Sequence, residues 1–252
     1  MSGRQPASVT ALGASCMTLL DRVTGQIEQV LTSAAGVATA TASLCAAAQQ
    51  AGRPLRHADL AALRPLVADV LREHDGLVAG AGVVLAPGAL ADAPRCIDWW
   101  WAGVNSGPEQ LEVDLDPESA EFYDYTTTEW YRSPERTGRP TVAGPYVDYI
   151  CTHQYTFTLA VPIVHEGRFA GVAGADILAS RVERLVLPAL SQIDHAVVLV
   201  GGNGRVIASN TTSILPGAAV SRQPLSSELV PVAGLGHADK KRTLPWTLFS
   251  LR

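Results

Sequence analysis

The sequence predicts an α+β fold in which a long N-terminal helix packs on a mainly antiparallel sheet. Apolar residues recur at helical spacing through the first 75 residues, and strand-like runs begin only after Gly76. Short Gly-containing turns join neighbouring runs, which favours hairpins over crossover connections. We therefore divide the chain into a helical region (1–75), a sheet module (76–177), and a linker helix with a smaller C-terminal β module (178–252).

One long helix is expected between Cys16 and Ala48. Its more apolar or small residues recur in alternating steps of four and three, which places them on one seam of a helix roughly 50 Å long at about 1.5 Å per residue. Gly25 and Gly36 weaken a free coiled coil, so the seam packs on the domain, on a second copy of itself, or on both. A homodimer through this helix is therefore one expectation. The seam consists of Cys16, Leu20, Val23, Ile27, Val30, Ala34, Val37, Thr41, Leu44 and Ala48.

A second helix follows, with Asp59 as its expected N-cap and Gly76 at its end. Two hairpins are predicted after it, one turning at residues 165–167 and one at residues 201–204. The run ILASRVERLVLPAL predicts a helix between those hairpins, and LPWTLFSL predicts a closing strand.

Charge and composition argue against several classes of protein. A net charge of −5 gives no general attraction to nucleic acid. The four cysteines match no metal-ligand spacing, and no phosphate or dinucleotide loop occurs, so neither a metal nor a cofactor is expected. The N-terminus lacks a signal-peptide pattern, and the uncharged stretch from Val30 to Gly52 is too rich in Ala, Thr and Ser for a membrane span. These features predict a cytoplasmic protein.

The segment EWYRSPERTGRPTVAGPYVD, residues 129–148, is too dense in rings, charges, prolines and glycines for a simple helix or strand. Together with QYTFTLAVPIVHEGRFAGVAGADI and AVVLVGGNGRVIASN, it resembles the bacterial Cache sensor domains, which are PAS-like modules of chemoreceptors and sensor kinases. The resemblance covers roughly residues 15–250 and is most specific at 123–177. It implies a PAS-like ligand-binding module and, as in double Cache members, a smaller second module.

Members of that family usually lie outside a membrane, between two spanning helices, and act on a signalling domain. Neither feature is evident in this sequence, so we expect a module that works in the cytoplasm or is paired with a separate output protein.

In amino-acid-binding double Cache domains, one group of residues holds the ligand carboxylate and another holds its amino group. By this resemblance the matching positions are Tyr125, Thr128, Trp130, Tyr131, Tyr146, Asp148 and Asp176, with Thr128 where the family has a carboxylate-binding Arg. A threonine hydroxyl cannot replace the charge of a guanidinium. Two acids that converge on one pocket favour a cation, which aromatic rings can surround.

Other interpretations stay open at this point. Asp148 is also a candidate turn cap, Asp176 a candidate helix cap, and the aromatic residues candidate core packing. Trp101 and His153 are further candidates for the pocket wall, and Arg132 is a candidate replacement for the missing Arg.

The sequence favours a Cache-type sensor for a small amine, with no enzymatic activity. An amino-acid or carboxylate sensor of the same fold is the alternative, using Arg132 or His153. A small hydrolase and a purely structural dimerisation module are the alternatives from other classes. Cys151 and His153 are the thiol and base that a hydrolase would offer, but no third group that would orient them is evident.

Overall fold

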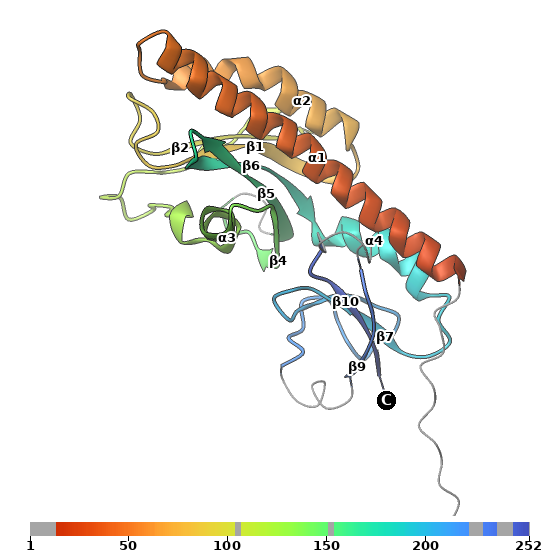
Figure 1. Cartoon of the computed structure of the whole chain (residues 1–252). Coiled ribbons are helices and arrows are strands. Elements are labelled where there is room, and N and C mark those ends of the chain that lie inside the picture. Colours follow the sequence, from red (N-terminus) through yellow and green to blue (C-terminus); the bar gives the residue numbers. More distant parts are fainter. Residues whose placement is uncertain (1–13, 104–106, 151–153, 222–228, 236–243, 252) are drawn as a thin grey trace, which may run out of the picture. The chain divides into compact units, whose positions relative to one another are not determined.

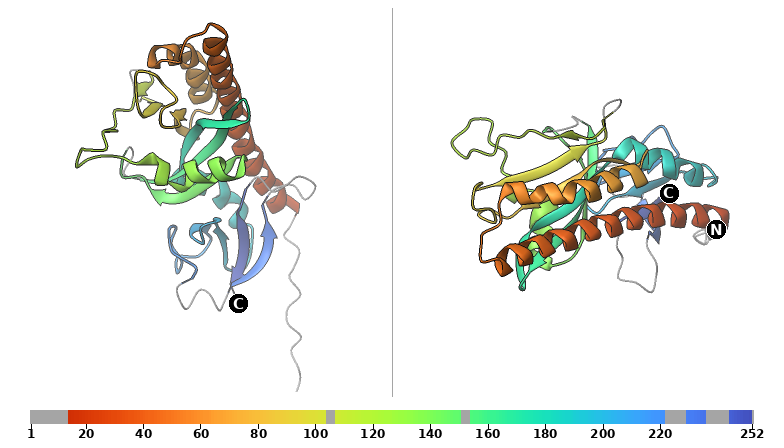
Figure 2. Two further views of the ribbon diagram at one scale, coloured as in Figure 1. Left: turned by 60° about the vertical axis from the view of Figure 1, so that its left-hand side comes forward. Right: turned by 90° about the horizontal axis from the view of Figure 1, so that it is seen from above.

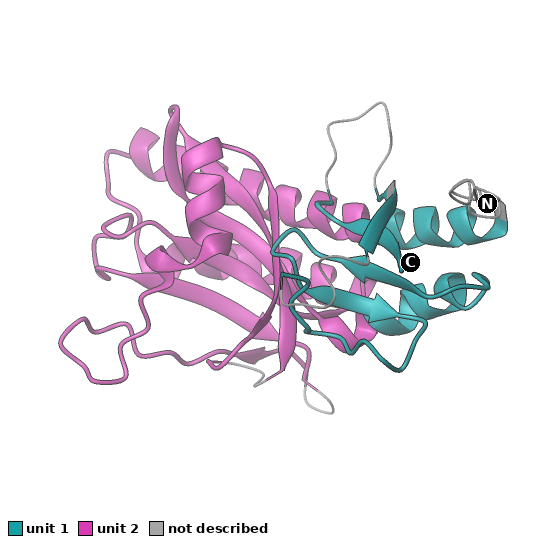
Figure 3. Ribbon diagram, turned by 90° about the horizontal axis from the view of Figure 1, so that it is seen from below, with its two compact units in different colours: residues 1–25, 183–252 teal, residues 26–182 magenta. Residues whose placement is uncertain are grey.

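The computed structural model describes residues 14–103, 107–150, 154–221, 229–235 and 244–251. The chain divides into two compact units, one formed by residues 26–182 and the other by residues 1–25 and 183–252 (Figure 3). The predicted α+β class, with a long N-terminal helix, a mainly antiparallel sheet and a second, smaller β module, is confirmed, and the larger sheet has six strands.

Helix α1, Ala14–Gln50, is the long helix expected from the seam. Nine of the ten seam residues are buried and Leu44 is half-buried, because the 3.6-residue period places them on one side of the helix. A dimer through α1 stays a prediction, and it would have to use another face of the helix.

Among the described residues one helix, Ser15–Gln50, has the length and apolar composition of a membrane-crossing helix. Only 33% of its most apolar window is buried. Core helices of soluble proteins and signal sequences near an N-terminus meet the same criterion.

The second helical region begins with a 3₁₀ helix, η1, at His57–Leu63, and continues as α2, Arg64–Glu73. Asp59 is not the N-cap that the sequence predicted. It is the third residue of η1, and its carboxylate accepts a bond from the backbone N–H of Arg56, which is the N-cap. Pro65 lies in the first turn of α2, where a missing N–H costs nothing.

The larger sheet has the strand order β3-β2-β1-β6-β5-β4, and all its neighbouring strands are antiparallel. Helices α2 and α3 lie on opposite faces of this sheet (Figures 1 and 2). The hairpin between β5 and β6 turns at residues 165–167, as predicted. The strands are β1 Val78–Leu85, β2 Cys96–Trp101, β3 Glu109–Gln110, β4 Thr141–Val147, β5 Tyr155–His165 and β6 Arg168–Leu178.

The smaller sheet has the order β8-β7-β10-β9 and is also antiparallel. The predicted hairpin at residues 201–204 and the predicted closing strand are both present in it. Its strands are β7 Val197–Val200, β8 Val206–Ser209, β9 Leu229–Gly234 and β10 Thr247–Leu251, and they follow helix α4, Ala179–Leu190.

The segment at residues 129–148 is not one bent stretch, as the sequence suggested, but a helix followed by a strand. Helix α3, Glu129–Thr137, contains Pro134, and Gly138 ends it in the left-handed region at φ 63°. The amphipathic pattern outweighs the cost of the internal proline, because Trp130 and Tyr131 are both buried.

Candidate functional site

A cavity of about 40 Å³ lies between the α3 face of the larger sheet and the segment that leads into α3. A water needs about 10–15 Å³ by this measure, so the cavity has room for roughly three waters. Its wall is mostly apolar and aromatic, with two carboxylates and two tyrosines. The lining residues are Val84, Ile97, Trp99, Leu111, Tyr123, Trp130, Tyr146, Asp148, Thr158, Ala160, Val172, Gly174 and Asp176.

Glycines in the sheet make room for the indole of Trp99 at one side of the cavity. A Cβ atom at Gly80 would lie 2.7 Å from Nε1 of Trp99, and one at Gly174 would lie 3.4 Å from the far edge of the same ring. Gly80 pairs with Asp176 across the strands, so the indole reaches the neighbourhood of that carboxylate.

A β-bulge in β4 turns the next acidic residue toward the cavity. Ala143 pairs with Thr158 and Tyr146 pairs with Thr156, so β4 contains one residue more than β5 across this step. Directly opposite residues share a face, and the extra residue therefore brings Tyr146 to the face of Thr158. Asp148, two residues further along, follows on the same side and lines the cavity.

A chain of hydrogen bonds crosses three strands beneath the cavity. The Thr158 hydroxyl donates to Oδ1 of Asp176 at 2.6 Å, which commits its single proton. The Tyr146 hydroxyl, 2.5 Å from the Thr158 oxygen, is therefore the donor in that contact. Its own lone pairs stay available, so the tyrosine presents an acceptor to the cavity.

The pKa of Asp176 is raised to about 7, mainly by burial; the Thr158 hydrogen bond lowers it and the nearby Asp148 carboxylate raises it, and about 7 is the net value. Burial also raises the pKa of Tyr146 well above its ordinary value, so its hydroxyl stays protonated at neutral pH. A positive charge in the cavity would favour the ionised form of Asp176.

Asp148 and Asp176 are 7% and 6% exposed, so both carboxylates are largely withdrawn from water. Asp148 also accepts the backbone N–H of Ile150 at 3.2 Å, which agrees with the turn-capping interpretation as well as with the cavity. The interpretation of Asp176 as a helix cap is wrong, because β6 runs on to Leu178 and α4 begins at Ala179.

Four of the predicted site residues come together at the cavity, namely Trp130, Tyr146, Asp148 and Asp176. Tyr125 and Tyr131 do not line it. Tyr125 is fully buried, and its hydroxyl donates to the Leu85 carbonyl at 2.8 Å. Tyr131 packs edge-on against Tyr125 and Phe169. Both rings support the cavity from behind, as core packing.

Thr128 is also outside the cavity wall. It is the residue before α3, and its hydroxyl donates to the Tyr125 carbonyl at 2.7 Å. Trp101 is half-buried against the same core but is not a lining residue. Arg132 is exposed, and His153 and Cys151 lie outside the described residues.

The sequence interpretation missed Trp99 and Tyr123, the two other aromatic residues of the wall. Trp99 shares a strand face with Trp101, so alternation alone could not separate them. Tyr123 is two residues before Tyr125, and the 3₁₀ turn η2, Tyr125–Thr127, sends the latter into the core.

Replacing Gly80 with Ala is expected to destabilise the domain by about 1–3 kcal/mol. The new methyl would lie 2.6 Å from the Trp101 ring and 2.7 Å from Trp99, and neither large ring can move freely in a packed core. Urea unfolding measures this loss. Gly36→Ala in α1 is the control, since a Cβ there meets nothing within 4 Å, and an equal loss in both variants would contradict the crowding argument.

Residues 109–184 match the family model of the first PDC sensor domain of methyl-accepting chemotaxis protein-like proteins. A stretch of 91 residues is 30% identical to the methyl-accepting chemotaxis protein TlpQ of Pseudomonas aeruginosa. It makes up 34% of this chain and 13% of that protein's length.

Solved structures with the same fold cover nearly the whole chain. The extracellular domain of mmHK1S-Z3, a candidate histidine kinase, has a TM-score of 0.62 at 14% identity. The match covers 94% of this chain and 93% of that domain. The ligand-binding domain of the Pseudomonas aeruginosa amino-acid chemoreceptor PctC, in complex with GABA, has a TM-score of 0.55 at 16% identity, over 96% and 98% of the two chains. The ligand-binding domain of the Pseudomonas fluorescens chemoreceptor CtaA, in complex with L-alanine, has a TM-score of 0.56 at 14% identity, over 95% of each chain.

These relatives are sensor domains, so a sensor role is supported, whereas the expected cytoplasmic location is not. Identities this low establish the fold alone. The resemblance predicted from the sequence is confirmed: the chain has the fold of the PDC, or Cache-type, ligand-sensing domains, and residues 109–184 match the first such domain of chemotaxis-protein-like members.

Proposed function

We propose that this protein is a sensor domain whose cavity binds a small molecule through a protonated amine. The two buried carboxylates, Asp148 and Asp176, are the observation that carries the proposal. Two acids that are withdrawn from water in one cavity repel each other, and a cation relieves this repulsion. The described lining contains no Lys, Arg or His, and a cationic group on the ligand would complement the two acids.

The remaining wall supports the same chemistry. Trp99, Tyr123, Trp130 and Tyr146 line the cavity, and an aromatic ring face attracts a desolvated ammonium by about 0.5–2 kcal/mol. The Tyr146 hydroxyl donates its proton to the Thr158 oxygen, so the Tyr146 oxygen adds an uncharged hydrogen-bond acceptor to the cavity wall. The volume of about 40 Å³ favours a short ligand.

An amino-acid ligand is the second candidate, because PctC and CtaA are seen with GABA and L-alanine. Against it, an α-carboxylate in this cavity would meet two carboxylates and no described positive side chain. We therefore place the amine first. Extracytoplasmic exposure, as in the mmHK1S-Z3 domain, and signalling to an output partner complete the proposal.

Matched ligand pairs test the ligand class. Calorimetry and thermal shift with ethylamine and L-alanine, and with methylamine and glycine, compare molecules that differ only by a carboxylate. The amine of each pair is expected to bind at least about tenfold more tightly, which corresponds to about 1.4 kcal/mol. Saturation at about 100 times the dissociation constant should stabilise the domain by about 2.7 kcal/mol. Preference for the amino acid of each pair would overturn the amine assignment and leave the sensor role standing.

A further inference from the structure

The cavity is closed on one side by a segment that has little regular structure. Leu111, Tyr123 and Trp130 line the cavity from this stretch, residues 111–131, which we call the cover segment. Between Leu111 and Asp124 it forms only turns, held by local bonds such as the one from the Tyr123 N–H to the Asp114 carbonyl at 2.9 Å. Its position over the sheet must therefore depend on contacts with neighbouring elements.

Arg95, in the loop between β1 and β2, makes several of these contacts at once. Its guanidinium lies 3.0 Å from the Asp124 carboxylate, 4.9 Å from the centre of the Phe122 ring and 5.7 Å from that of Tyr125. Phe122 and Asp124 flank Tyr123 directly, and Tyr125 follows two residues after it. The Arg95 side chain is only 19% exposed, so water screens the ion pair incompletely.

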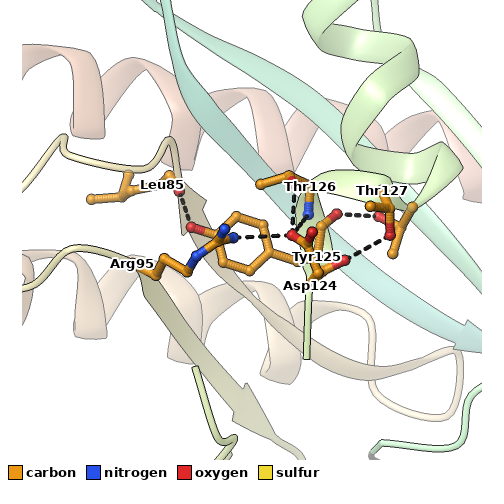
Figure 4. Close-up of polar contacts among 7 residues, drawn as sticks. Leu85, Arg95, Asp124, Tyr125, Thr126 and Thr127 are labelled. Carbon is orange, nitrogen blue, oxygen red and sulfur yellow. Dashed lines mark hydrogen bonds and ion pairs between the residues drawn. The ribbon is translucent and has the colours of Figure 1, made fainter. Parts of the chain in front are cut away.

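The same carboxylate also organises the approach to α3 (Figure 4). Oδ1 of Asp124 accepts the backbone N–H of Thr126 at 3.2 Å and its hydroxyl at 2.6 Å, which starts the turn η2. Two residues after that turn the chain reaches Glu129, the first residue of α3, and then Trp130 in the cavity wall. Asp124, which forms the ion pair with Arg95, therefore lies in the sequence between Tyr123 and Trp130, the two aromatic residues that the cover segment contributes to the cavity wall.

We infer that Arg95 is a positioning residue for the ligand site. It holds Tyr123 and Trp130 over the cavity from outside, through Phe122, Asp124 and Tyr125, and it does not itself line the cavity. Arg95 therefore sets how often the cover segment opens and how long a ligand stays bound. The part of this inference that concerns bound ligand depends on the proposed function, whereas the part that concerns the cover segment does not.

Hydrogen exchange on the whole protein, without ligand, tests the inference. Arg95→Met keeps an apolar stem but removes the charge and the planar group. Exchange in peptides from residues 109–131 is expected to speed up about tenfold, while exchange in β5 and β6 stays unchanged. Arg95→Lys keeps the charge without the flat stacking surface, and should give an intermediate rate.

Arg53→Met is the matched control, because Arg53 forms a comparable pair with Asp59 at 2.8 Å in the same compact unit but away from the cavity. It should leave exchange in residues 109–131 at the wild-type rate. Unchanged exchange there in Arg95→Met, or equal acceleration throughout the sheet, would overturn the inference, because Arg95 would then have no role or only a general structural one.

Stopped-flow dissociation of ethylammonium adds the second measurement. Arg95→Met is expected to release it about tenfold faster than wild type, and Arg53→Met at the wild-type rate. A wild-type protein that binds no ethylammonium would count against the proposed ligand class, and the exchange experiment would still decide the role of Arg95. Unchanged release from Arg95→Met would restrict Arg95 to the unliganded cover segment and overturn its role in retaining the ligand.

Discussion

Asp176→Asn is expected to abolish amine binding while making the ligand-free protein more stable. Asparagine has nearly the shape of the acid and can still accept the Thr158 hydrogen bond, but it offers no charge to an ammonium group. Loss of a buried charged partner commonly costs about 2–5 kcal/mol of binding, or at least about thirtyfold in affinity.

The gain in stability follows from the raised pKa of Asp176. Because the folded-state pKa is about 7 and the ordinary value is 3.8, the folded state binds the proton more tightly than the unfolded state does. Stability therefore falls as the pH rises from about 4 to about 7, by up to about 4 kcal/mol. Asp176→Asn removes this loss, so its melting temperature at pH 8 should exceed that of wild type by several degrees.

Asp98 supplies the matched control for this experiment. It is 4% exposed, its pKa is also raised by burial, and it accepts bonds from Trp100 at 3.2 Å and Gln110 at 3.0 Å. It follows Ile97 and precedes Trp99 in β2, so its side chain points to the other face of the sheet. Asp98→Asn should keep wild-type affinity. Equal loss of binding in both variants would mean that the effect is general and that Asp176 does not meet the ligand.

The affinity for an alkylammonium ion is expected to depend steeply on pH below neutrality. The cation binds the ionised carboxylate, so in the free protein the proton on Asp176, with its pKa of about 7, competes with it. Affinity should fall about tenfold for each pH unit below about 7, and level off above it until the amine itself loses its proton near about pH 10.

Calorimetry between about pH 5 and pH 9 measures this dependence, and buffers with different heats of ionisation measure the accompanying proton release. Release should approach one proton per ligand at about pH 6. A flat affinity from about pH 5 to pH 8 would contradict the assignment, because a carboxylate with this pKa could not then pair with the ligand.

The sequence was a good guide to elements that local pattern decides. The seam of α1 and the turns at residues 165–167 and 201–204 were predicted correctly because helical period and turn chemistry act over a few residues. The segment around Pro134 was predicted incorrectly because its local signals conflict. Burial of Trp130 and Tyr131 against the sheet decides in favour of a helix.

The site was less predictable, because its wall is made by contacts between distant strands. The acids Asp148 and Asp176 could be found from the resemblance, but the bulge that turns Asp148 inward depends on pairing with β5. Gly174 leaves space for the indole of Trp99, which lines the cavity, whereas Trp101 does not line it. Tyr123 lines the cavity in place of the predicted Tyr125, which begins a 3₁₀ turn and is fully buried in the core. No periodicity within one strand encodes these relations.

The position of Trp99 and Trp130 in the cavity wall also gives the protein a built-in optical signal. Indole emission responds to a charge and to the loss of water beside the ring, and the proposed ammonium ligand would bring both changes. Of the five tryptophans in the chain, Trp99 and Trp130 line the cavity, whereas Trp246 belongs to the other compact unit and is only 2% exposed. Occupancy of the site can therefore be followed by intrinsic fluorescence, with no dye attached to a cavity too small to accept one.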